Sequence, residues 1–108
     1  MKKPVQTPKT LSSEAKSIWR KLVAEYSIED EGGYQVLQVG LEAYCRMRDA
    51  QKQIASDGVT TTDRFGQVKA HPLLPVERDA RAQYLAALKA LNLDLEPLRD
   101  RPGRPGGK

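Results

Sequence analysis

The residues best suited to chemistry lie in the stretch from position 60 to position 97. It contains His71, the only histidine of the chain, with Asp63 and Glu77 nearby in sequence. A histidine held beside a carboxylate can act as a general base. That chemistry also needs a pocket, and a 108-residue chain with one Trp and one Phe can bury only a thin core. Because a histidine before a proline at a helix start more often caps or packs, we expect no catalytic residue.

Metal binding and thiol chemistry have less support. The chain has one histidine and one cysteine, without the paired spacing of metal ligands. Cys45 follows Tyr44 in the middle of an expected helix, which is typical of a small, buried apolar residue. Trp19 falls on the apolar stripe of another expected helix and is assigned to the core. We therefore expect no metal and no cofactor.

The charged run "ERDAR" at residues 77–81 suits a helix surface. Glu77 and Arg81 are four residues apart, which is the spacing of a helical ion pair. Arg78 lies on a different side of the helix from Arg81. We interpret the run as a face that is solvated or that meets another subunit, in preference to a nucleic-acid contact.

The net charge of +4 is concentrated at the two ends. Residues 1–10 and residues 99–108 each carry +3, which leaves −2 for residues 11–98. Basic ends rich in Pro and Gly suit contact with nucleic acid, although they can also be solubilising tails. No apolar run is typical of a signal peptide or a membrane span, so we expect a soluble intracellular protein.

Two helices are expected in the first half of the chain. Ser12 or Ser13 can cap the first, and Asp30 can cap the second. The second helix should run over residues 33–57 and end at Gly58. It carries two apolar stripes. The first is Val36, Gly40, Ala43, Met47, Ala50 and Ile54, and the second is Leu37, Leu41 and Tyr44. The first stripe is rich in small residues and suits close packing, either on the first helix or on another subunit.

The second half should contain a short β-hairpin or an ordered loop, followed by a third helix. Residues 59–70 include Val and Thr residues typical of strands, and residues 63–66 can form the turn. The third helix should begin around Pro72 and end near Leu91 or Asn92. The expected fold class is mainly α, with a three-helix core in which the long central helix is part of a helical hairpin.

The tail "RPGRPGGK" partly resembles the core of an AT-hook, which inserts arginines into the minor groove of DNA. Pro102 stands where that core has its first arginine, so we interpret the tail as a non-specific contact to phosphates.

Together, these features resemble the short, all-helical kind of phage terminase small subunit over about residues 10 to 100. The features that carry the resemblance are Leu11 and Trp19, Gly32 and Gly33 with "LEAY" at 41–44, Asp57 and Gly58, His71 and Pro72, "ERDAR" at 77–81, and Leu93, Leu95 and Pro97. The resemblance implies a non-catalytic protein of the host cell cytoplasm that forms a homo-oligomeric ring. It implies that the protein binds viral double-stranded DNA and delivers it to the large ATPase and nuclease subunit, which it regulates.

The chain shows a basic arm where many members of that family have an N-terminal helix-turn-helix. We therefore expect contacts that are mostly to phosphates. The predicted DNA-binding residues are Lys2, Lys3, Lys9, Lys16, Arg20, Lys21, Arg99, Arg101, Arg104 and Lys108. The predicted oligomer interface is Val36, Gly40, Met47, Tyr84 and Leu88. The predicted organisation is a disordered arm at 1–11, a core at 12–98 and a disordered tail at 99–108. A small dimeric helical transcriptional regulator is the alternative, and an enzyme with His71 as base is a third hypothesis.

Overall fold

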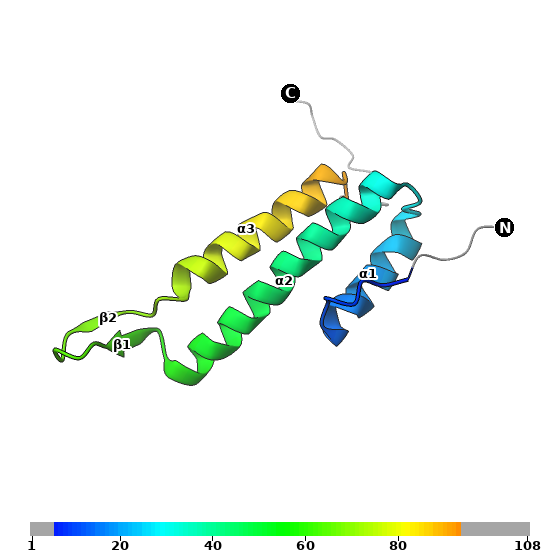
Figure 1. Cartoon of the computed structure of the whole chain (residues 1–108). Coiled ribbons are helices and arrows are strands. Elements are labelled where there is room, and N and C mark those ends of the chain that lie inside the picture. The colour runs from blue at the N-terminus through cyan, green and yellow to red at the C-terminus, as the bar shows by residue number, and fades with distance from the viewer. Residues whose placement is uncertain (1–5, 94–108) are drawn as a thin grey trace, which may run out of the picture.

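The fold is a pair of long antiparallel helices with a shorter helix packed against one of them (Figure 1). This computed structural model describes residues 6–93. The elements are α1 (Ser13–Tyr26), α2 (Glu31–Asp57), β1 (Thr60–Thr62), β2 (Val68–Ala70) and α3 (Leu74–Ala90). The prediction of a mainly α fold with three helices is confirmed, and the segment between α2 and α3 is a β-hairpin.

Capping residues set where α1 and α2 begin. The Ser12 side chain accepts a hydrogen bond from the backbone N–H of Ala15 at 3.1 Å, as an N-cap should. The Asp30 carboxylate accepts one from the backbone N–H of Gly33 at 2.9 Å. Because Asp30 is itself the N-cap, α2 begins at Glu31, two residues earlier than predicted. It ends as predicted, with Gly58 at φ +88°.

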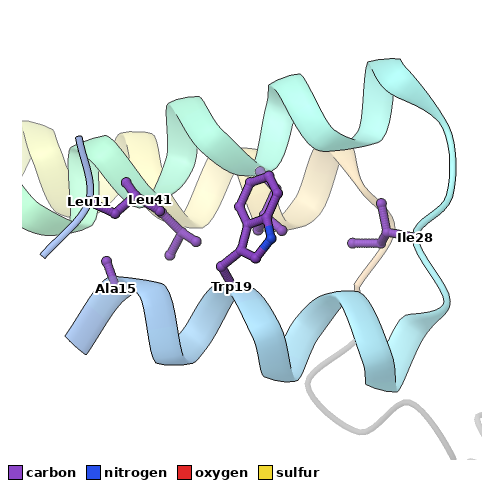
Figure 2. Close-up of a cluster of buried hydrophobic side chains, with 6 residues drawn as sticks. Leu11, Ala15, Trp19, Ile28 and Leu41 are labelled. Carbon is purple, nitrogen blue, oxygen red and sulfur yellow. The ribbon is translucent and has the colours of Figure 1, made fainter. Parts of the chain in front are cut away.

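The main core lies between α1 and the N-terminal half of α2. Trp19 is 3% exposed, and its ring stacks on that of Tyr34 with the centroids 5.9 Å apart. Leu37 and Leu41 on α2 are fully buried in the same cluster. Figure 2 shows this cluster between α1, which lies below, and α2, which lies above. The assignment of Trp19 to the core is therefore confirmed, and the second stripe of α2 faces α1. Leu11, at the end of the predicted arm, also packs in this core at 4% exposure.

The small-residue stripe of α2 packs against α3, and not against the first helix as one prediction had it. A Cβ atom added to Gly40 would lie 2.5 Å from the Cβ of Ala87. Ala43, Ala50 and Ala80 are also buried. Because the side chains between them are small, the backbones of α2 and α3 approach closely. The small-residue stripe therefore faces α3, and Leu37 and Leu41 face α1.

Polar contacts define the hairpin and the start of α3. Thr60 pairs with Ala70 and Thr62 with Val68. One carboxylate oxygen of Asp63 accepts hydrogen bonds from the backbone N–H groups of residues 65 and 67, at 2.8 and 2.9 Å. The third helix begins at Leu74, two residues after the predicted Pro72, which lies in the turn before the helix.

The third helix ends at Ala90, one residue before the predicted end near Leu91 or Asn92. Leu91 is the C-cap, and Asn92 follows it in the left-handed region at φ 60°. Among the helices that the structure describes, none is long and apolar enough to cross a membrane.

Candidate nucleic-acid interface

The predicted DNA-binding residues that the structure describes lie on α1 and just before it. Lys16 and Arg20 each directly follow a buried residue, Ala15 and Trp19. With 3.6 residues per helical turn, that position places both cations on one flank of the buried stripe, one turn apart. Lys21 lies further around the helix and is exposed, as is Arg20. Within residues 6–93, none of these three cations forms an ion pair.

Hydrogen bonds outside the core fix α1 against α2. The Tyr44 hydroxyl donates to the Glu14 carboxylate at 2.7 Å, and the Arg48 Nε lies 3.4 Å from the other carboxylate oxygen. The hydrogen bond from Tyr44 and then the contacts of Arg48 hold the pKa of Glu14 below its usual value. The residues lie about thirty positions apart in sequence, so no local pattern predicts their contact. These contacts fix the position of α1, and of the cations on its flank, relative to α2.

Acidic residues gather at the opposite end of α1. Glu25 lies in its last turn, and Glu29, Asp30 and Glu31 follow in the connection to α2. The charge along this part of the molecule therefore changes from basic to acidic over about the length of α1. The positive potential of α1 is therefore expected to be greater toward its start than toward its end.

Of the other predicted DNA-binding residues, one is described by the structure and six are not. Lys9 is exposed in the segment before α1. Six others lie outside the described residues, namely Lys2, Lys3, Arg99, Arg101, Arg104 and Lys108. The last described residue is Leu93, and Leu91 just before it packs against the core that holds α1. The chain therefore leaves the described region at the end of the α2–α3 pair where α1 lies.

His71 joins the base of the hairpin to α2. It is 4% exposed, and its Nε2 lies 2.9 Å from a carboxylate oxygen of Asp57, the last residue of α2. Its Nδ1 accepts a hydrogen bond from the backbone N–H of Leu73 at 3.0 Å, which leaves Nε2 as the donor to Asp57 when the ring is neutral. Gln53 and then His71 lower the pKa of Asp57. Both ring nitrogens thus have hydrogen-bond partners, and His71 is packed as the sequence predicted, but it does not cap α3, which begins without a side-chain cap.

The remaining chemical candidates also have structural partners. The Cys45 sulfur lies 3.5 Å from the Ser12 hydroxyl and is half-buried. Arg81 donates to Glu77 at 2.9 Å, so the predicted helical ion pair is present. In the part of the chain that the structure describes, no three His, Cys, Asp or Glu side chains are grouped to hold a metal ion.

The five residues predicted for an oligomer interface separate into two groups. Gly40 and Met47 are buried, and Gly40 is in direct contact with α3 of the same chain. Val36, Tyr84 and Leu88 are half-buried. Val36 lines a groove between α2 and α3, together with Gln35, Val39, Gln83, Ala86 and Ala87. No local sequence pattern predicts this groove, because its two walls come from residues almost fifty positions apart.

Within residues 6–93 the protein is thus a small helical protein, and three of its cations without ion pairs lie on α1. A model of the family described as phage terminase, small subunit, matches residues 15–97, which is most of the chain. The chain belongs to that family, and the resemblance seen in the sequence is confirmed. A search of curated proteins and a search of solved structures each found no match.

Proposed function

We propose that this protein is a non-catalytic adaptor for DNA packaging, which binds viral double-stranded DNA and presents it to the large terminase subunit. The observation that carries the proposal is the family match over residues 15–97. In this role the protein acts as a homo-oligomer, and the large subunit supplies the ATPase and nuclease activities.

The charge distribution supports DNA as the ligand. Lys16, Arg20 and Lys21 have no carboxylate to neutralise them within the described residues, and they lie on a helix fixed by its core and by Glu14. The proposal adds the basic residues of the two termini to these contacts, because residues 1–10 and 99–108 each carry a charge of +3. Such contacts are mostly to phosphates and depend on salt because they release counterions.

The geometry of α2 disfavours the alternative of a small transcriptional regulator. A helix that reads bases enters the major groove with one face exposed. The 27-residue α2 is packed by α1 on one side and by α3 on another, and its seven buried positions extend from Gly33 to Ala50. DNA contact through the cations of α1 is more compatible with this arrangement.

Binding to duplex DNA, measured by fluorescence anisotropy between about 50 and 200 mM salt, tests the role of α1. A variant with Lys16, Arg20 and Lys21 all changed to alanine should bind more weakly and show a flatter salt dependence. Each lost phosphate contact reduces the slope of log K against log salt by about 0.9. The matched control changes Arg78, Arg81 and Lys89, three exposed cations of α3, to alanine and should bind like the wild type.

Deletion of residues 99–108 tests the tail separately. The shortened protein should keep its oligomeric mass but bind DNA more weakly, with a lower salt slope. Unchanged affinity in both the tail deletion and the α1 triple variant would remove these cations from the proposal. ATP hydrolysis by the large subunit, with and without this protein and DNA, tests the packaging role itself.

A further inference from the structure

The β-hairpin presents an apolar surface that nothing in the described chain covers. Val59, Phe65 and Val68 are 61%, 74% and 70% exposed. Among residues 6–93, they are the three most exposed large apolar side chains apart from Val39. The hairpin projects beyond the end of the α2–α3 pair, with its turn furthest from α1 (Figure 1). A two-stranded hairpin alone is marginally stable in water, so a covered surface would stabilise it.

A complementary concave surface lies toward the other end of the same two helices. The groove between α2 and α3 is lined by Gln35, Val36, Val39, Gln83, Ala86 and Ala87, none of which is ionisable. Val39 is 62% exposed in its wall. Val39 and the core residue Leu41 differ by about 200° around the helix, so the groove lies on the side of α2 away from α1. Neither α1 nor the core cluster fills it.

The hairpin cannot reach the groove of its own chain. Val39 and the last residue of α2, Asp57, are separated by eighteen residues of continuous helix. At 1.5 Å per residue, that distance is about 27 Å. The hairpin also points away from the groove along the axis of the pair (Figure 1). A hairpin that fills this groove must therefore come from another molecule.

The hairpin turn carries a cation and one wall of the groove continues to an acid, while Arg46 donates a hydrogen bond to Gln83 of the other wall at 2.8 Å. At the hairpin turn, the Arg64 guanidinium lies 5.1 Å from the centre of the Phe65 ring and has no carboxylate partner within residues 6–93. At the groove, Gln35 donates to the Glu31 carboxylate at 3.1 Å, and the described chain gives Glu31 no cation. Glu31, Gln35 and Val39 follow one another at four-residue spacing, so they form one row along the groove wall.

We propose that the hairpin of one copy docks in the α2–α3 groove of a second copy, with Phe65 and Val68 against the groove and Arg64 beside Glu31. The proposal rests on the oligomeric adaptor described above and names its interface. The two surfaces differ, so the contact is head-to-tail and leaves a free hairpin and a free groove at each end of a dimer. Repetition closes into a ring or continues as a filament.

Disulfide trapping tests the geometry directly. Two proteins are prepared in a Cys45→Ser background, one with Phe65→Cys and the other with Val39→Cys, and one of them carries a size tag. After mixing and mild oxidation, the mixed disulfide should form, while each protein alone should form little. The matched control replaces Val39→Cys by Leu85→Cys, a residue 53% exposed on another side of α3. Equal trapping by Leu85→Cys, or trapping mainly between two Phe65→Cys chains, would overturn the head-to-tail contact.

Solution mass by light scattering after size exclusion gives an independent test. The wild type should be larger than one chain, and Phe65→Ser should lower the mass while helical circular dichroism is kept. Leu85→Ser should leave the mass unchanged. Arg64→Glu should also lower the mass, and combining it with Glu31→Arg should restore it. A wild type with the mass of one chain at every concentration, or an unchanged Phe65→Ser mass, would reject the interface.

The same variants separate this interface from the proposed function. The cations of α1 are far from the hairpin, so an isolated Phe65→Ser chain should retain their weak, salt-dependent DNA binding. If mass and trapping fail while the α1 triple variant still loses DNA binding, the interface is wrong and the adaptor stands. If the assembly forms as proposed and neither the α1 nor the tail change alters DNA binding, the adaptor's DNA surface is wrong instead.

Discussion

The two ends of α2 are stabilised in different ways. At the N-terminal end, α2 lies between α1 and α3, and large side chains such as Trp19, Leu37 and Leu41 are buried. At the C-terminal end, α1 is absent, the contact with α3 uses mainly small residues, and hydrogen bonds of His71 hold the hairpin. The cluster of large buried side chains therefore lies toward one end of α2. The other end keeps large apolar groups exposed and available to a partner.

The largest effect should come from removing an aromatic ring at the packed end. Trp19→Ala should lower the free energy of unfolding by about 3–5 kcal/mol, because Trp19 is 3% exposed and stacks on Tyr34. The matched change at the other end is Phe65→Ala. Because Phe65 is 74% exposed, this substitution should lower the free energy of unfolding by less than about 1 kcal/mol. Urea unfolding at a concentration where the chain is monomeric measures both. Similar losses in the two variants would contradict the proposed difference between the ends.

A smaller effect should come from the close contact between the long helices. Gly40→Ala places a methyl group 2.5 Å from the Cβ of Ala87, and neither group can rotate away. Overpacking of this kind costs about 1–3 kcal/mol, which exceeds the gain of up to about 1 kcal/mol from the better helix propensity of alanine. We therefore expect a lower midpoint of thermal unfolding.

Gly32→Ala is the control for this contact. An added Cβ there would meet only the Asp30 carboxylate, at 3.4 Å. Gly32 is also in a helix, so the substitution has the same effect on chain entropy and should be neutral or stabilising. A Gly40→Ala protein as stable as Gly32→Ala would show that α2 and α3 are less closely packed than the structure indicates.

The helices could be predicted because their signals are local. Ser12 and Asp30 cap α1 and α2 as their residue types suggest, and the apolar spacing of Trp19 indicates its burial. The choice of partner for each stripe of α2 could not be predicted. Whether the stripe around Gly40 meets α1 or α3 depends on how closely two backbones approach, which no local pattern reports.

The candidate site was predictable only in its charges. The sequence identifies Lys16, Arg20 and Lys21 as cations on a helix, and the structure shows them without ion pairs in its described part. The groove that includes Val39 could not be found in advance, because it requires residues of α2 and α3 to be side by side. The exposure of Phe65 could not be predicted either, because it depends on where the hairpin turn lies relative to the helices.

The smallest effect concerns the polar contact that holds α1, and it depends on pH. The Tyr44 hydroxyl lowers the pKa of Glu14 from its unfolded value of 4.5, while burial and then Glu14 raise the pKa of Tyr44 to about 12. A lowered carboxylate pKa contributes stability above pH 4.5, and that contribution is lost as the pH falls through the folded pKa. A raised tyrosine pKa contributes stability below its unfolded value of 10.0, lost as the pH rises toward 12.

Tyr44→Phe should therefore be less stable than the wild type by a constant amount between these limits, and the difference should shrink in acid and in strong alkali. Urea unfolding across pH measures this difference. Tyr34→Phe is the control, since its hydroxyl has no hydrogen-bond partner within residues 6–93. Glu14 and Arg48 remain in contact in Tyr44→Phe. The stability of this variant should therefore still fall in acid, although less than that of the wild type. A difference that stays constant from acid to alkaline pH would mean that α1 is held by its core alone.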